Sequence, residues 1–351
     1  MSRADRLVEL IGERELDSLL VTNLVNVRYL TGFTGTNGAC VVTPERRLFL
    51  TDFRYVEQAE EQVPDFERLP AARELVAGVV PHLSGRAGFD DAHMSVRTHQ
   101  KFAEAVGEGV ELVAAGGLVE DLREVKEPGE LERIGEAARL ATSVLEEVLG
   151  RGLAGRTERA VALDIESSIR AAGGEDPSFP AIVAAGAHGA LPHAEPRDVE
   201  IPAGKLVVID WGAKVDGYCS DCTRTVASGP VDAAAEEVYE LVRDAQAQAL
   251  AAVRAGAEGR AVDAVARDAI EAAGHGERFG HGLGHGVGLE VHEGPRVSKQ
   301  SEDVLAAGNV VSVEPGVYIP GEVGVRIEDL VAVTDDGADV FTSYPKELVT
   351  V

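Results

Sequence analysis

The feature that most constrains the fold is an internal repeat in the later part of the chain. The segment GRTERAVALDIESSIRAAGGE (155–175) is echoed by GRAVDAVARDAIEAAGHGE (259–277). Each copy follows a long stretch rich in Ala, Leu and Val, at 130–150 and 233–255, and each precedes β-rich segments. Two similar α/β halves in one chain predict a pseudo-symmetric domain with a site between the halves.

The part of the chain before this repeat has a different pattern. Short β-rich runs alternate there with segments of helical spacing, which is typical of an α/β domain. The β-rich runs are DSLLVTN (17–23), GACVVTP (38–44) and RRLFLTD (46–52). The segments of helical spacing are 53–63, 71–80 and 95–107.

A break separates the two parts. Gly116-Gly117 interrupts the pattern, and a connector follows in which Pro128-Gly129 opens a long helix. A chain of 351 residues is also too long for one comfortable core. We therefore predict an α/β (α+β) protein with a small N-terminal α/β domain over residues 1–122 and a C-terminal pseudo-symmetric domain over residues 123–351.

The charge balance narrows the possible partners. The chain has 33 Lys and Arg against 60 Asp and Glu, a formal net charge of -27. A phosphate backbone or an anionic bilayer would be repelled, so neither nucleic acid nor a membrane is expected as a partner. The N-terminus lacks the apolar core of a signal peptide, and the apolar runs are too short to span a bilayer.

The cysteines indicate a reducing compartment. There are three, Cys40, Cys219 and Cys222, and so small and odd a number fits the cytoplasm. Cys219 and Cys222 form C-x-x-C, which is read as a redox pair, as half a zinc site, or as two small apolar residues in a strand. We favour the last, because an offset of three points strand side chains to opposite faces and no second cysteine pair exists.

Two carboxylates lie in the stretch VVIDWGAKVDGYCSDCTRT (207–225), which has the pattern of a β-hairpin. Asp210 follows an apolar run that reads as a buried strand, and Asp221 lies on the return strand. A turn at Val215-Asp216 makes the two face each other directly, and a turn at Asp216-Gly217 sets them one diagonal step apart. Both alternatives put them on one face of the sheet. Facing carboxylates repel, so a positive charge is expected between them.

The second half repeats this arrangement. Glu314 follows the apolar run VVSV, and Glu328 lies in VRIED on the return strand. A turn around residues 320–322 puts the two opposite each other. Arg326 shares their face and is either a charge partner of the site or an ordinary salt-bridge residue at a strand end.

Histidines and glycines are concentrated between the two hairpins. The stretch FGHGLGHGVGLEVHEGP (279–295) contains His281, His285 and His292, with glycines that permit close backbone approach. No Gly-Lys-Ser/Thr follows, so it is not a phosphate loop. His193 lies further upstream in GALPHAEP, after a β-rich stretch.

Four carboxylates with imidazoles form a hard, oxygen-rich ligand set. Such a set suits two divalent metal ions, with Mn²⁺ favoured and Co²⁺ or Zn²⁺ as alternatives. Two ions sharing carboxylates can hold a bridging hydroxide and polarise a carbonyl, which is the chemistry of hydrolysis. The remaining histidines can donate hydrogen bonds to a developing oxyanion.

Taken together, these motifs resemble those of a known family. The stretches 207–225 and 279–295, with SVEPGVYIP and GVRIED, look like the metal-binding motifs of the Xaa-Pro peptidases, aminopeptidase P and prolidase. These enzymes have the pita-bread fold shared by methionine aminopeptidase and creatinase. NVRYLTGFTGTNGACVV and LFLTDFRYVEQA resemble their N-terminal domain, so the resemblance covers nearly the whole chain.

The resemblance implies a ligand set for two metal ions. Asp221 and Glu328 match bridging ligands, Asp210 matches a ligand of one ion, and His285 and Glu314 match ligands of the other. All five positions are filled, although some relatives with this fold have lost ligands and work without metal. A working metallopeptidase is therefore expected.

The resemblance also implies roles around the metals. Glu314 matches a carboxylate that accepts a proton from the nucleophilic water. His193, His281 and His292 match histidines that line the substrate site, and His292 and His193 would stabilise the tetrahedral intermediate or contact the scissile amide. Arg326 matches an arginine beside the last metal ligand.

The expected activity is hydrolysis of the Xaa-Pro bond at the N-terminus of a dipeptide or short peptide, by a homodimer as in relatives. The partner is then a small peptide with proline at its second position. Two alternatives are a creatinase-like or broad-specificity aminopeptidase hydrolase and a non-catalytic binding module. Arg296 is a candidate for a contact to a substrate carboxylate.

Overall fold

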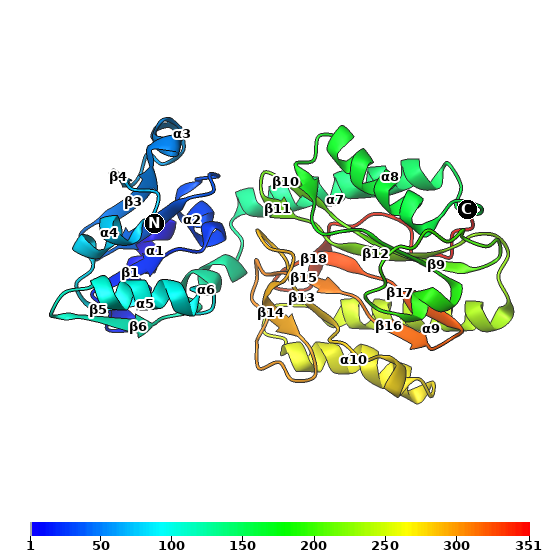
Figure 1. Cartoon of the computed structure of the whole chain (residues 1–351). Coiled ribbons are helices and arrows are strands. Elements are labelled where there is room, and N and C mark those ends of the chain that lie inside the picture. Colours follow the sequence, from blue (N-terminus) through cyan, green and yellow to red (C-terminus); the bar gives the residue numbers. More distant parts are fainter. Residues whose placement is uncertain (1) are drawn as a thin grey trace. The chain divides into compact units, whose positions relative to one another are not determined.

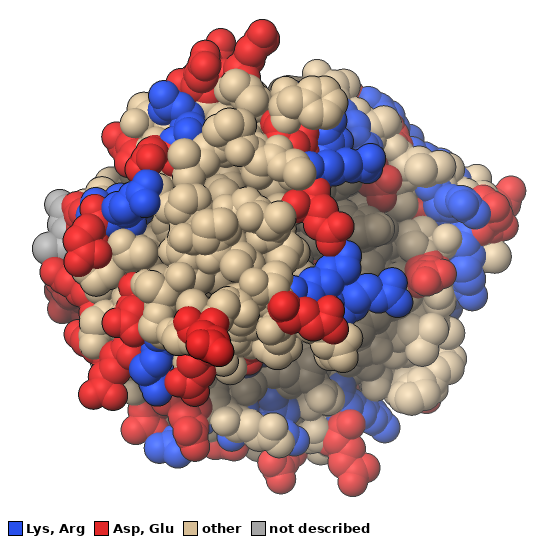
Figure 2. Space-filling model, turned by 60° about the vertical axis from the view of Figure 1, so that its left-hand side comes forward, with Lys and Arg blue, Asp and Glu red and all other residues tan. Residues whose placement is uncertain are grey.

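A computed structural model describes residues 2–351. The chain forms two compact units, Met1–Arg123 and Glu124–Val351, each with its own strands and helices (Figure 1). Among residues 2–351, no helix is both long and apolar enough to cross a bilayer. On the face in Figure 2, acidic side chains are spread around the outline and basic ones are scattered between them.

The N-terminal unit is built on one mixed sheet of order β4-β3-β2-β1-β5-β6. The antiparallel pairs are β1–β2 and β2–β3, and the other pairs are parallel. The strands are β1 (Ser18–Val21), β2 (Gly38–Val42), β3 (Arg47–Asp52), β4 (Glu67–Ala71), β5 (Gly85–Phe89) and β6 (Val110–Ala114). The helices are α1 (Arg3–Glu13), α2 (Leu24–Thr31), α3 (Val56–Gln62), α4 (Val76–Val79), α5 (Val96–Ala105) and α6 (Leu118–Glu124).

The helix predicted over 71–80 is mostly wrong. The segment before it forms the edge strand β4, and only Val76–Val79 is α-helical before a 3-10 turn at Val80–His82. Pro81 lies in that turn and has no N–H to continue a helix. Another short 3-10 turn, Phe53–Tyr55, opens the segment predicted as a helix over 53–63.

In the C-terminal unit the internal repeat appears as two matching helix pairs. These are α7 (Pro128–Leu149) with α8 (Glu158–Ala171), and α9 (Ala233–Ala252) with α10 (Gly259–Ala272). Each pair buries its apolar stripe in its own core, with Leu145 fully buried in the first half and Val242 in the second. Within this unit the helices cover the outer faces and the strands lie between them (Figure 1).

The strands of the C-terminal unit carry the residues of interest. The first half has a sheet of order β12-β9-β8, and the second has one of order β14-β13-β15-β18-β19. Their strands are β8 (Ile182–Ala185), β9 (Leu206–Trp211), β12 (Cys222–Ala227), β13 (Gly284–Gly286), β14 (Glu293–Val297), β15 (Val310–Val313), β18 (Asp329–Val333) and β19 (Ala338–Val340). Smaller ladders contain β7 (Asp176–Pro177), β10 (Ala213–Val215), β11 (Tyr218–Cys219), β16 (Gly316–Ile319) and β17 (Val323–Arg326). Short 3-10 turns lie at η3 (Gly186–Ala190) and η4 (Gly276–Arg278).

The cysteines behave as apolar residues. Cys40, Cys219 and Cys222 are free and buried. Burial raises the pKa of the Cys222 thiol well above its usual range, which disfavours the reactive thiolate. The interpretation of C-x-x-C as two small buried strand residues is confirmed.

Candidate metal centre

The first hairpin turns at Asp216-Gly217. Both residues have left-handed backbone angles, with φ of 47° and 81°, as a two-residue type I′ turn requires. The register pairs Thr223 with Asp210, so Asp221 lies one diagonal step from Asp210 on the same face. Of the two alternatives for this turn, the second is correct.

The second hairpin sets its carboxylates opposite each other. Val313, the residue directly before Glu314, pairs with Asp329 of the return strand. Gly316, two residues after Glu314, pairs with Arg326. This register places Glu314 across from Glu328, as the turn at 320–322 predicted.

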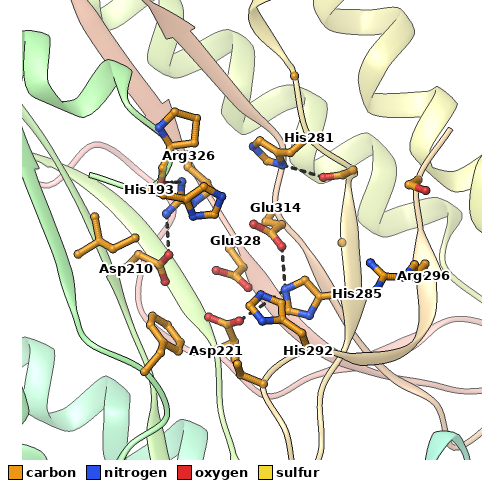
Figure 3. A pocket seen from close by; sticks show the side chains of 18 of the residues that line it. His193, Asp210, Asp221, His281, His285, His292, Arg296, Glu314, Arg326 and Glu328 are labelled. Atoms are coloured by element: carbon orange, nitrogen blue, oxygen red, sulfur yellow. Dashed lines mark hydrogen bonds and ion pairs between the residues drawn. The ribbon is translucent and has the colours of Figure 1, made fainter. Parts of the chain in front are cut away.

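The two hairpins bring three carboxylates together. Oxygens of Asp210, Asp221 and Glu328 lie within 4.8 Å of one another. His285 Nε2 lies 3.1 Å from Glu314 Oε1 and 3.7 Å from Asp221 Oδ2 (Figure 3). The five residues predicted as metal ligands therefore form one cluster.

The cluster fits divalent cations. Within residues 2–351, Asp210 Oδ1 and Glu328 Oε1 are buried without a hydrogen-bond partner. The pKa of Asp221 lies well above its usual range, because burial desolvates the carboxylate and the charges of Glu328 and Asp210 repel it. Unpaired buried carboxylates are costly unless a cation neutralises them, and oxygen ligands with one imidazole suit ions such as Mn²⁺.

Glu314 is electrostatically different from its neighbours. Its Oε1 accepts a hydrogen bond from Ser312 Oγ at 3.1 Å and faces His285. Burial raises the pKa of Glu314, but the hydrogen bond and charge of His285 outweigh this and lower it to about 2. Glu314 is therefore ionised at neutral pH.

Arg326 is a buried charge partner of the cluster rather than a solvent-exposed residue at a strand end. It is only 3% exposed, and its Nη2 donates to Asp210 Oδ2 at 2.6 Å. Its Nε donates to Thr223 Oγ1 at 2.9 Å, and that hydroxyl donates to Glu328 Oε2 at 2.9 Å. Arg326 thus supplies a positive charge to Asp210, and a positive charge between Asp210 and Asp221 stays a prediction.

Sequence reasoning missed Tyr318 and Thr223. Tyr318 Oη lies 2.9 Å from both Arg326 Nη1 and His281 Nε2. His281 Nδ1 lies 2.7 Å from the carbonyl oxygen of Gly282, so Nδ1 carries the proton and Nε2 accepts from Tyr318. Tyr318 has the same strand parity as Glu314, and that parity was the signal available in the sequence.

The glycines around His285 allow close backbone approach. A Cβ at Gly284 would lie 1.9 Å from the carbonyl oxygen of Ser312, and one at Gly286 would lie 1.9 Å from that of Gly294. The ladder between β13 and β14 shifts register between His285 and Gly286. Such bulges redirect a side chain, here toward the carboxylates.

The cluster opens into a cavity of about 790 Å³. His193, His281 and His292 line it with the carboxylates, and the rings of His285 and His292 lie 4.4 Å apart (Figure 3). Other parts of the wall are apolar or basic and include Phe179, Ile182, Pro192, Arg296 and Lys299.

Comparisons with known proteins agree with this geometry. Residues 132–335 match the model of metallopeptidase family M24, and residues 3–125 match that of the creatinase/prolidase N-terminal domain. The chain is 34% identical to an Xaa-Pro dipeptidase of Pyrococcus furiosus, over 99% of each chain.

Solved structures are similar over the whole chain. An Xaa-Pro dipeptidase from Bacillus anthracis has 39% identity and a TM-score of 0.97 over 99% of each chain. An X-Pro aminopeptidase from Thermotoga maritima MSB8 has 34% identity and a TM-score of 0.91 over 100% of each chain. The predicted fold and the resemblance to Xaa-Pro peptidases are confirmed, and the chain belongs to metallopeptidase family M24.

Proposed function

We propose that the protein is a dinuclear-metal peptidase that hydrolyses the Xaa-Pro bond at the N-terminus of dipeptides or short peptides. The observation that carries the proposal is the buried carboxylate cluster with two unpartnered oxygens, open to a cavity lined by histidines. Relatives named Xaa-Pro dipeptidase support the choice of substrate class.

The proposed ligands are the five clustered residues. As the resemblance implies, the two ions would share Asp221 and Glu328, one ion would also bind Asp210, and the other would also bind His285 and Glu314. Bound divalent cations, with Mn²⁺ favoured over Co²⁺ or Zn²⁺, would neutralise the carboxylates and supply Lewis acidity for attack by water on the scissile carbonyl.

The chain's own groups would handle the proton and the developing charge. Glu314 is ionised and has a second carboxylate oxygen available to accept a proton from the attacking water. His292 and His193 line the same cavity and would donate hydrogen bonds to the tetrahedral intermediate. His281 would be held by Tyr318, and through it by Arg326.

The cavity's basic residues favour a dipeptide. Arg296 and Lys299 line it together with the carboxylate cluster. Their positive charges would attract the terminal carboxylate of a dipeptide.

Hydrolysis with defined metal tests the proposal. The protein is stripped of metal and reloaded with Mn²⁺, then given an Xaa-Pro dipeptide and an Xaa-Pro-Xaa tripeptide at equal concentration. Cleavage of the dipeptide alone indicates a dipeptidase, and cleavage of the tripeptide indicates an aminopeptidase. Glu314→Gln should lower kcat by about 100-fold or more, whereas Glu322→Gln, an exposed change in the same hairpin, should not.

Two outcomes would favour a different function. Cleavage of neither peptide with metal bound would refute the proposed peptidase activity, and hydrolysis of creatine would then favour a creatinase-like enzyme.

A homodimer and a cytoplasmic location stay predictions from the resemblance and the composition. Light scattering coupled to gel filtration tests the first of these.

A further inference from the structure

The loop of residues 186–197 carries His193 but does not hold its side chain. Within residues 2–351, the His193 ring has no hydrogen bond or ring contact, and it is exposed in the cavity wall. The position of the ring is therefore set by the loop backbone. That loop begins directly after β8 and includes η3.

The buried carboxylate of Glu158 contacts both ends of this loop, and the N–H of Arg159 also donates to the carbonyl oxygen of Arg197 at 3.0 Å. Glu158 is 1% exposed, and its Oε1 accepts a hydrogen bond from the N–H of Ala185 at 3.0 Å, where the loop begins. His188 Nδ1 lies 2.9 Å from Glu158 Oε2. At the far end, Arg197 donates from its backbone N at 3.1 Å and from Nε at 3.0 Å.

The middle of the loop is held separately. The carbonyl oxygen of Pro192 accepts from Arg326 Nη1 at 3.1 Å. η3 also lies against β17, where a Cβ at Gly324 would lie 1.8 Å from the carbonyl oxygen of Gly189. His193 therefore lies between an anchor near the metal cluster and the two loop ends bound to Glu158.

Glu158 is held in place at the start of a helix. It is the first residue of α8, directly after the N-cap Thr157, whose side chain accepts from the N–H of Ala160. Burial raises the pKa of Glu158, but hydrogen bonds from Arg197 and Ala185 outweigh this and lower it. The carboxylate is thus ionised and accepts from all its partners at neutral pH.

We propose that Glu158 is a positioning residue that fixes His193 in the substrate cavity by closing the loop of residues 186–197. The proposal rests on the proposed function in so far as His193 contacts substrate. Glu158 itself is not among the residues that line the cavity or form the carboxylate cluster.

A double-mutant cycle tests the proposal. Glu158→Gln keeps the side-chain size but replaces one accepting oxygen with a donor. It should lower kcat/KM on an Xaa-Pro dipeptide by about 10- to 100-fold, as expected for a displaced contact, with bound metal unchanged. In a His193→Ala background the same change should cost less than about 2-fold, because its effect acts through His193.

Hydrogen–deuterium exchange provides a readout that does not depend on activity. Exchange in peptides covering 186–197 should become faster in Glu158→Gln. The matched control is Glu166→Gln in the same helix. It makes the same change at a carboxylate that accepts from the N–H of Ala181, which lies before β8 rather than after it. The control should change neither exchange in the loop nor kcat/KM.

The outcomes separate this proposal from the proposed function. Equal losses with and without His193, or unchanged loop exchange, would overturn the positioning role. If the wild type cleaves no Xaa-Pro peptide, the function fails while exchange still decides whether Glu158 orders the loop. If Glu158→Gln does not fold, Arg197→Gln is the alternative variant. It removes the ion pair with Glu158 at a side chain that is 48% exposed. Its effects on kcat/KM and on loop exchange should have the same sign and be smaller.

Discussion

Replacing Asp221 with Asn should stabilise the metal-free protein and remove its stabilisation by metal. Asp221 is 5% exposed, and the charges of Glu328, Asp210 and Glu314 all repel it. Its one ion-pair partner in the described residues is His285 at 3.7 Å. Asn has nearly the same shape but no charge, so the change relieves repulsion without leaving a cavity.

The magnitude follows from the spacing of the carboxylates. The ligand oxygens lie at most 4.8 Å apart, and two unit charges at that limit repel by about 3.5 kcal/mol at an effective dielectric constant of about 20. Proton uptake by the metal-free cluster relieves part of this, so we expect a gain of about 1–3 kcal/mol in the free energy of unfolding. For a domain of this size that is roughly 2–10 °C in Tm.

Thermal unfolding with a chelator and with saturating Mn²⁺ is the assay. Metal at 100 times its Kd should stabilise the wild type by about 2.7 kcal/mol, and Asp221→Asn should lose most of that shift. Asp336→Asn, an exposed change in the turn after β18, is the control and should alter neither value. A metal-free variant less stable than the metal-free wild type, with an intact Mn²⁺ shift, would refute the reasoning.

Two further predictions concern the same cluster. Because the pKa of Asp221 is raised in the folded protein, its contribution to stability is full below the ordinary value of 3.8 and is lost as pH rises through the raised pKa. The stability gap between metal-free Asp221→Asn and wild type should therefore widen in urea unfolding as pH rises above 3.8, and a constant gap would contradict this. Thr223→Val removes the hydroxyl that links Arg326 to Glu328, and should weaken metal binding by about 10- to 100-fold in chelator competition, whereas unchanged affinity would show that this hydroxyl does not orient Glu328.

The sequence by itself determined the parts of the site that depend on local periodicity. Side chains alternate along a strand, so an apolar run followed by Asp210 or Glu314 fixes which face each carboxylate occupies. Together with the repeat, this was enough to predict two carboxylate hairpins in two similar halves. The matching motifs then indicated the family.

Tertiary structure decided what depends on contacts between distant segments. Arg326 and Asp210 are 116 residues apart in sequence, and their contact depends on how the two halves pack. Likewise, only the folded chain shows the hydrogen bonds of Tyr318 and Thr223. The same holds for the hydrogen bonds between Glu158 and the loop that carries His193. Local pattern fixes the direction of a side chain, but only packing fixes which distant group it meets.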